Sequence, residues 1–153
     1  MNRYTVRYAH LEIPSLLVEG DLVMGSDTIG KMGNTGSCTA NHLHIDVVEG
    51  FINKIIRLSE IGYDKEYIPN LKQLNYFIDK NLFDFEILIT TYFGDPTYSS
   101  PYIHHGYDVV PENRHYEPGR NSLIYWNRSK TGIVLKAGHD NGYGNYVLIG
   151  FEA

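Results

Sequence analysis

Short apolar segments separated by glycine-rich turns run along most of this chain, and they constrain its fold more than any other feature. Residues 3–9 alternate in character and carry β-branched and aromatic side chains, which is the pattern of a half-buried strand. Fifteen glycines and thirteen tyrosines suit many short strands joined by tight turns. We therefore expect a β-rich domain, with further strands in the segments 42–48, 87–93, 107–110, 122–126, 131–138 and 145–151.

The middle of the chain differs from the rest in its composition and in the spacing of its apolar residues. Lys and Glu become frequent after Gly50, and apolar residues behind Pro69 fall at helical spacing. We expect one helical insert at about residues 69–83, whose apolar positions are Leu71, Leu74, Phe77, Ile78 and Leu82. Residues 51–61 fit either a helix or a pair of strands, so this segment stays unassigned.

Length and charge exclude several classes of protein. The 153 residues amount to one domain, and the formal net charge of -5, without a cluster of Lys and Arg, argues against nucleic-acid binding. No apolar run approaches the roughly 20 residues of a membrane-spanning helix, so we expect no membrane insertion. Residues 1–10 lack the apolar core of a signal peptide, and the single cysteine, Cys38, excludes an internal disulfide. Nothing in the composition predicts the oligomeric state.

Two histidine clusters carry the chemistry. In a strand, His42 and His44 would point the same way, roughly 6.5 Å apart along the chain. Asp46 would share their face, while the apolar residues between them would face the core. In the second cluster, either His104 or His105 could pair with Asp108. Two imidazoles and one carboxylate would give three zinc ligands and leave a fourth position open, as in catalytic zinc sites. From the spacing alone, a metal site and a chance occurrence of these residues are about equally favoured.

Several motifs together resemble the lysostaphin-type, or LytM-like, zinc endopeptidases that cut peptidoglycan. The segment YAHLEIPSLLVEGDLVMGSDTIGKMGNTGSCTANHLHIDV, residues 8–47, is similar to the YAHL-to-HLH run of that family. HHGYDVV at 104–110 resembles the H-x-G-x-D motif of the family, and residues 131–150 and 89–95 resemble further segments. The resemblance covers about two-thirds of the chain. It implies a compact antiparallel β-sheet or sandwich of the duplicated hybrid motif type.

The order of these motifs departs from the family pattern. There the H-x-G-x-D segment comes first and HLH last, whereas here HLH lies at 42–44 and HHGYD at 104–108. Joining Ala153 to Met1 would restore the order of the family, so the sequence looks circularly permuted. Residues 89–153 would correspond to the first half of the family domain, 1–48 to its second half, and 49–88 to a connecting segment. A gene boundary drawn through a larger protein is the alternative.

The resemblance also implies roles for individual residues. It puts one zinc ion per chain on His104, Asp108 and His44, because the family spacing is H-x-G-x-D. His42 and His10 would be the two histidines that perform general acid–base work without binding the metal. Tyr98 would stabilise the oxyanion, with Tyr102 as the competing choice. Asp46 would either orient a ring nitrogen of His44 or be an exposed strand residue.

The function that these expectations support is a zinc metallopeptidase that hydrolyses peptide bonds in the stem or cross-bridge of peptidoglycan. It would act at the bacterial cell wall as a phage-released enzyme, a virion-associated enzyme or a part of a larger exported protein, and a phage is the favoured source. Two alternatives use the same β architecture without hydrolysis: a phosphocarrier domain with paired histidines, and a wall-binding module. Asp108 argues against the phosphocarrier, since a carboxylate at the site would repel a phosphohistidine. The bond that is cleaved does not follow from the sequence.

Overall fold

The architecture is mainly β. The computed structural model describes residues 3–37, 40–53, 82–91, 104, 106–112, 122–126 and 128–152. Its strands are β1 (Arg3–Leu11), β2 (Leu22–Val23), β3 (Asp27–Lys31), β4 (Leu43–Glu49), β5 (Ile87–Thr91), β6 (Tyr107–Pro111), β7 (Leu123–Trp126), β8 (Gly132–Asp140) and β9 (Gly144–Glu152). The expected β fold class is thereby confirmed.

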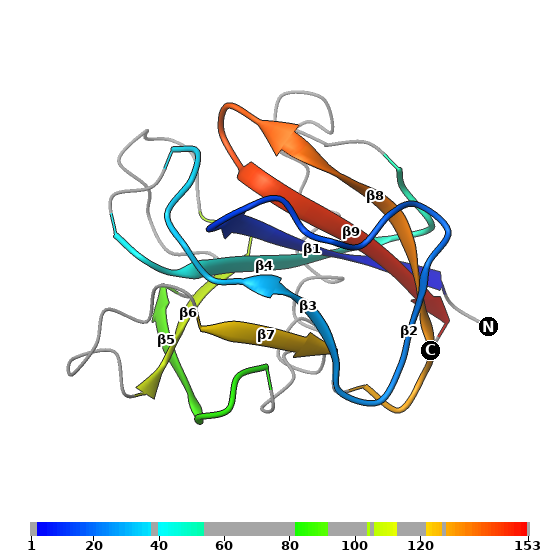
Figure 1. Ribbon diagram of the computed structural model, residues 1–153, viewed down its shortest axis with the longest axis horizontal. Coiled ribbons are helices and arrows are strands. Elements are labelled where there is room, and N and C mark those ends of the chain that lie inside the picture. Colours follow the sequence, from blue (N-terminus) through cyan, green and yellow to red (C-terminus); the bar gives the residue numbers. More distant parts are fainter. Residues whose placement is uncertain are drawn as a thin grey trace.

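Seven strands form one antiparallel sheet in the order β2-β8-β9-β1-β4-β6-β5, and β3 and β7 form a second, two-stranded sheet. Figure 1 shows β1 (blue) and β9 (red) side by side in the middle of the large sheet. Side chains of both sheets meet in one apolar cluster, in which Trp126, Ile124 and Ile29 of the small sheet join Tyr8 and Ile45 of the large one. The core therefore lies between the two sheets, as in a sandwich.

The two faces of the central strands differ in chemistry, as the alternation predicts. On β4, Leu43 and Ile45 are fully buried in the core. His44 and Asp46 point to the opposite face, where they contact each other. Cross-strand pairing places Arg7 of β1 opposite Asp46. The sheet thus has an apolar face against the core and a second face that carries ionisable groups.

A β-bulge near the end of β1 moves one histidine to the second face. Tyr8 and Leu11 both contribute to the core, although strict alternation would put them on opposite faces. The register of β1 with β9 shifts between these two residues, and His10 has a φ of 64°. Such left-handed backbone is uncommon outside glycine, and bulges serve to re-aim a side chain. The ring of His10 consequently lies beside the rings of His42 and His44.

Most of the predicted helix falls outside the described residues. Of the range 69–83, only Leu82 and Phe83 are described; they form a bend and are buried in the core. Residues 51–53 have no regular structure, and the remainder of the unassigned segment 51–61 also lies outside the described ranges. Among the described residues, no helix is long and apolar enough to cross a membrane.

Candidate metal centre

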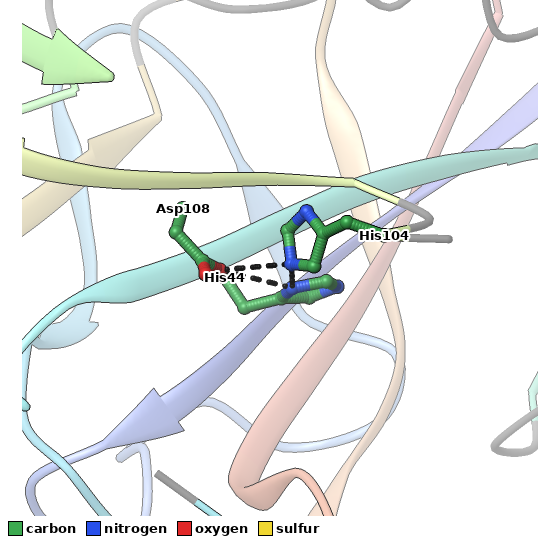
Figure 2. Close-up of side chains that lie close together, drawn as sticks. All are labelled: His44, His104 and Asp108. Carbon is green, nitrogen blue, oxygen red and sulfur yellow. Dashed lines mark hydrogen bonds and ion pairs between the residues drawn. The ribbon is translucent and has the colours of Figure 1, made fainter. Parts of the chain in front are cut away.

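Antiparallel pairing of β4 with β6 brings the two histidine clusters together. His44 on β4 lies opposite Asp108 on β6, and His104 precedes β6 by three residues. Nδ1 of His44 lies 3.2 Å from Nε2 of His104, and both nitrogens lie 3.2–3.3 Å from Oδ1 of Asp108. Figure 2 shows the three side chains pointing at one another. Among the described residues, these three form a group whose atoms could hold a metal ion.

Hydrogen bonds at the other ring nitrogens decide which nitrogens carry protons. Nδ1 of His104 lies 2.7 Å from the carbonyl oxygen of Gly106, and Nε2 of His44 lies 2.8 Å from Oδ2 of Asp46. Because a carbonyl or a carboxylate accepts but cannot donate, each of these nitrogens must be the N–H donor. In the neutral rings, Nδ1 of His44 and Nε2 of His104 then carry lone pairs that point at the same place as the Asp108 carboxylate. Such a set of donor atoms suits a cation.

Gly106 allows this close approach. A Cβ atom at this position would lie 2.6 Å from the carbonyl oxygen of Ile45 and 2.9 Å from Cε1 of His44. Contacts that short do not occur, so any side chain would push β6 away from β4 or displace the His44 ring. The close packing of β6 against β4 therefore requires a residue without a side chain between His104 and Asp108.

His42 and His10 flank the three donor atoms. Nε2 of His42 lies 3.3 Å from Oδ1 of Asp108, and its Nδ1 donates to the carbonyl oxygen of Ala40 at 2.9 Å. Nδ1 of His10 donates to the carbonyl oxygen of Thr35 at 2.7 Å. The centroids of the His10 and His42 rings are 4.9 Å apart. Both histidines thus have Nδ1 fixed by a backbone carbonyl, and Nε2 of His42 faces the Asp108 carboxylate.

Burial and charge set the protonation of these groups. Burial lowers the pKa of His10 to about 4, in spite of the hydrogen bond to Thr35, so this ring is neutral near pH 7. Burial opposes ionisation of Asp108, but its side-chain interactions with His104, His42 and His44, which are strongest when these rings carry a proton towards it, outweigh burial and lower the pKa of this carboxyl. Burial likewise opposes protonation of His44, but hydrogen bonds to Asp108 and Asp46 raise the pKa of this ring. The centre therefore attracts positive charge, whether a proton or a metal ion.

Asp46 is buried and faces His44, so of its two expected placements the structure has the one beside the ring nitrogen. Sequence reasoning missed its partner, Arg7, which is also buried and forms an ion pair with Asp46 at 2.6 Å. An arginine in an alternating strand normally indicates the solvent side, and only the cross-strand register reveals the pair. Tyr98, Tyr102 and His105 lie outside the described residues.

Comparison with known proteins finds a distant relative. Peptidoglycan DD-endopeptidase ShyC of Vibrio cholerae serotype O1 is 36% identical to this chain over 80 residues, which cover 47% of the chain and 18% of the relative. The chain thus spans less than a fifth of the length of that protein. No protein-family model matches the chain, and no solved structure matches it. A peptidoglycan endopeptidase is therefore a distant homologue of this chain, and a group that could bind a metal lies on its sheet.

Proposed function

We propose that this protein is a zinc-dependent peptidoglycan endopeptidase whose metal ligands are His44, His104 and Asp108. The observation that carries the proposal is the convergence of two imidazole lone pairs and one carboxylate oxygen within 3.2–3.3 Å of one another. The substrate class is inferred from the similarity to a peptidoglycan DD-endopeptidase. The bond that the enzyme hydrolyses is a peptide bond of the stem or cross-bridge.

The separations and the chemical types of the donor atoms suit zinc. Ligand bonds of about 2.0–2.1 Å in tetrahedral geometry put ligand atoms about 3.3–3.4 Å apart. The observed separations of 3.2–3.3 Å agree with this spacing. Calcium and magnesium prefer shells made of oxygen atoms, whereas imidazole nitrogens suit zinc. Three protein ligands also leave a fourth position for water or substrate, as catalysis requires.

The residues around the ligands suit peptide hydrolysis. A bound zinc ion would polarise the scissile carbonyl and make a bound water easier to deprotonate. Nδ1 of His42 and Nδ1 of His10 each donate to a backbone carbonyl, so that in the neutral ring the opposite nitrogen can accept a proton. A proton from the attacking water can go to such a nitrogen, and a proton can return from it to the leaving amine. We assign general acid–base work to this pair, and oxyanion stabilisation by Tyr98 stays a prediction.

A phosphocarrier is disfavoured by the position of Asp108. Its Oδ1 lies 3.3 Å from Nε2 of His42 and from Nδ1 of His44. A phosphoryl group on either nitrogen would stand against this carboxylate and be repelled. A hydrolase with a cationic centre accounts for the same carboxylate without this conflict.

The permuted order of motifs and its division into 89–153, 49–88 and 1–48 also belong to the proposal. In the antiparallel pairing of β1 with β9, Arg3 lies opposite Glu152, and a tight turn could join strands paired in this way. An engineered variant in which Ala153 is joined to Met1 and the new termini lie within 49–88 should then keep both the sheet and the lysis of cell walls. Action at the bacterial cell wall, with a bacteriophage as the source of the enzyme, completes the proposal.

The first test measures metal content and wall lysis together. We expect one zinc per chain by mass spectrometry, and clearing of isolated cell walls that a chelator stops and zinc restores. His44→Ala should lose the metal and lysis together, because two remaining ligands hold the ion poorly. His42→Ala should lose lysis but keep the metal.

His139→Ala is the matched control, since His139 is an exposed histidine of β8 outside this centre. It should keep both metal and lysis. Loss of metal from His42→Ala and its retention by His44→Ala would show that the ligands are assigned wrongly. Absence of zinc and of clearing on walls of several chemotypes would refute the proposed function.

A further inference from the structure

The ion pair between Arg7 and Asp46 lies directly behind the candidate metal centre. Nε and Nη2 of Arg7 donate to Oδ2 of Asp46 at 2.9 and 2.6 Å, and Nε2 of His44 donates to the same oxygen at 2.8 Å. The side chains of Arg7 and Asp46 are 9% and 3% exposed, so water screens this pair little. A continuous chain of hydrogen bonds therefore runs from Arg7 through Asp46 to His44.

This geometry fixes the tautomer of His44. An oxygen that already accepts two N–H groups of a guanidinium can only accept from a third neighbour. The proton of the neutral His44 ring must then sit on Nε2, which leaves the lone pair on Nδ1 facing His104 and Asp108. Carboxylates that accept from a ligating histidine in this way orient the ring and raise its basicity.

Arg7 is in turn held by an aromatic ring. Its guanidinium carbon lies 4.2 Å from the centroid of the Tyr143 ring, in the turn between β8 and β9. Backbone N–H groups of Gly142 and Tyr143 donate to Oδ2 of Asp140, which holds this turn in shape. Stacking on the ring suits the planar guanidinium and would not suit a lysine ammonium equally well. The orientation of Arg7 is thus determined by two elements besides its own strand.

Asp46 depends on Arg7 for its orientation. Among the described residues, its second oxygen, Oδ1, is buried and has no hydrogen-bond partner. All hydrogen bonds that hold the carboxylate group therefore converge on Oδ2, and two of the three come from Arg7. Without Arg7, the carboxylate would keep only the contact to the ring that it is meant to orient.

We propose that Arg7 is a positioning residue for the metal centre, which acts through Asp46 to hold the His44 ring with Nδ1 directed at His104 and Asp108. This inference rests on the proposed function, because it assumes that the three side chains bind a metal. It adds a residue of β1 that is not one of the three proposed ligands and yet determines how strongly they bind the ion.

The test compares zinc affinity between variants of the intact chain. Arg7→Met should weaken zinc binding by about 10- to 100-fold, measured by competition with a chelating dye, since loss of such an outer partner typically costs that much. Arg7→Lys, which keeps the charge but not the planar fork, should fall between Arg7→Met and the natural protein. Arg3→Met is the matched control, because Arg3 lies on the same strand as Arg7 but forms an exposed salt bridge with Glu152 of β9. It should bind zinc as the natural protein does.

A second variant separates positioning from stability. Replacing both partners of a buried ion pair with apolar residues is often neutral for folding. Arg7→Met with Asp46→Leu should therefore fold even if Arg7→Met alone does not, and should still bind zinc about 10- to 100-fold more weakly. Nitrogen-15 spectra of the metal-free proteins should show the proton of His44 on Nε2 in the natural chain and a mixture of tautomers in both variants.

The possible results are distinguishable. If the natural protein binds zinc and the folded variants bind it equally tightly, the role of Arg7 is refuted while the proposed function stands. If the natural protein binds no zinc at all, the proposed function fails and the inference fails with it. Weaker binding in Arg7→Met, intermediate binding in Arg7→Lys and an unchanged Arg3→Met control support the inference.

Discussion

The two faces of strand β4 meet opposite requirements within seven residues. On one face, Leu43 and Ile45 are fully buried against the small sheet. On the other face, His44 and Asp46 are buried as well, but Asp46 forms an ion pair with Arg7 and accepts a hydrogen bond from His44. The apolar face contributes stability through area removed from water, whereas the polar face holds charged groups that are tolerable only in pairs. Neighbouring residues of one strand should therefore respond very differently to the same substitution.

The largest effect on stability is expected on the apolar face. Ile45→Ala should lower the free energy of unfolding by about 2–5 kcal/mol, because it removes a fully buried side chain and leaves a cavity. The folded fraction should still bind the metal. His44→Ala, one position away, should abolish metal binding and lower stability less. Urea denaturation of both metal-free variants checks the difference, and an equal loss of stability would contradict the contrast between the faces.

A smaller effect is expected where β6 meets the polar face. Gly106→Ala should cost about 1–3 kcal/mol, typical of overpacking, and should also lose the metal, since the new Cβ meets both Ile45 and His44. Gly30→Ala is the comparison, because its Cβ would meet only the end of the Leu11 side chain at 3.2 Å. Melting temperature and zinc content measure the two results. Normal zinc binding by Gly106→Ala would show that the contact with His44 does not matter.

The smallest effect on stability is expected at acidic pH and arises from Asp46 on the polar face. Burial opposes ionisation of Asp46, but Arg7 and the hydrogen bond from His44 outweigh it and lower the pKa of this carboxyl below 3.8. Its contribution to stability is therefore present above that value and is lost as the pH falls through the folded-state pKa. Denaturation between about pH 6 and pH 3 should show that the metal-free natural protein loses stability faster than Asp46→Asn. Parallel curves would mean that Asp46 is not held as an anion in the folded chain.

Local patterns in the sequence predicted much of this architecture. Alternation in residues 42–48 predicts that His44 and Asp46 share one face and that Leu43 and Ile45 share the other, because the period of a strand is a local property. The structure also brings His44, His104 and Asp108 together, although their roles as ligands stay predictions. What one sequence could not show depends on contacts between strands. Arg7 finds Asp46 only through the register of β1 with β4, and His10 reaches the polar face only through a bulge.

The position of β1 between β9 and β4 has a consequence for how the chain folds. Residues of β1 pair with partners up to 149 positions away, as Arg3 does with Glu152. A sheet whose middle depends on such distant partners has a high contact order, and chains of this kind fold slowly because long loops must close first. On the ribosome, β1 can find its partner in β9 only after nearly the whole described chain has been made. The group of His44, His104 and Asp108, which lies where β4 pairs with β6, is therefore expected to form late in folding.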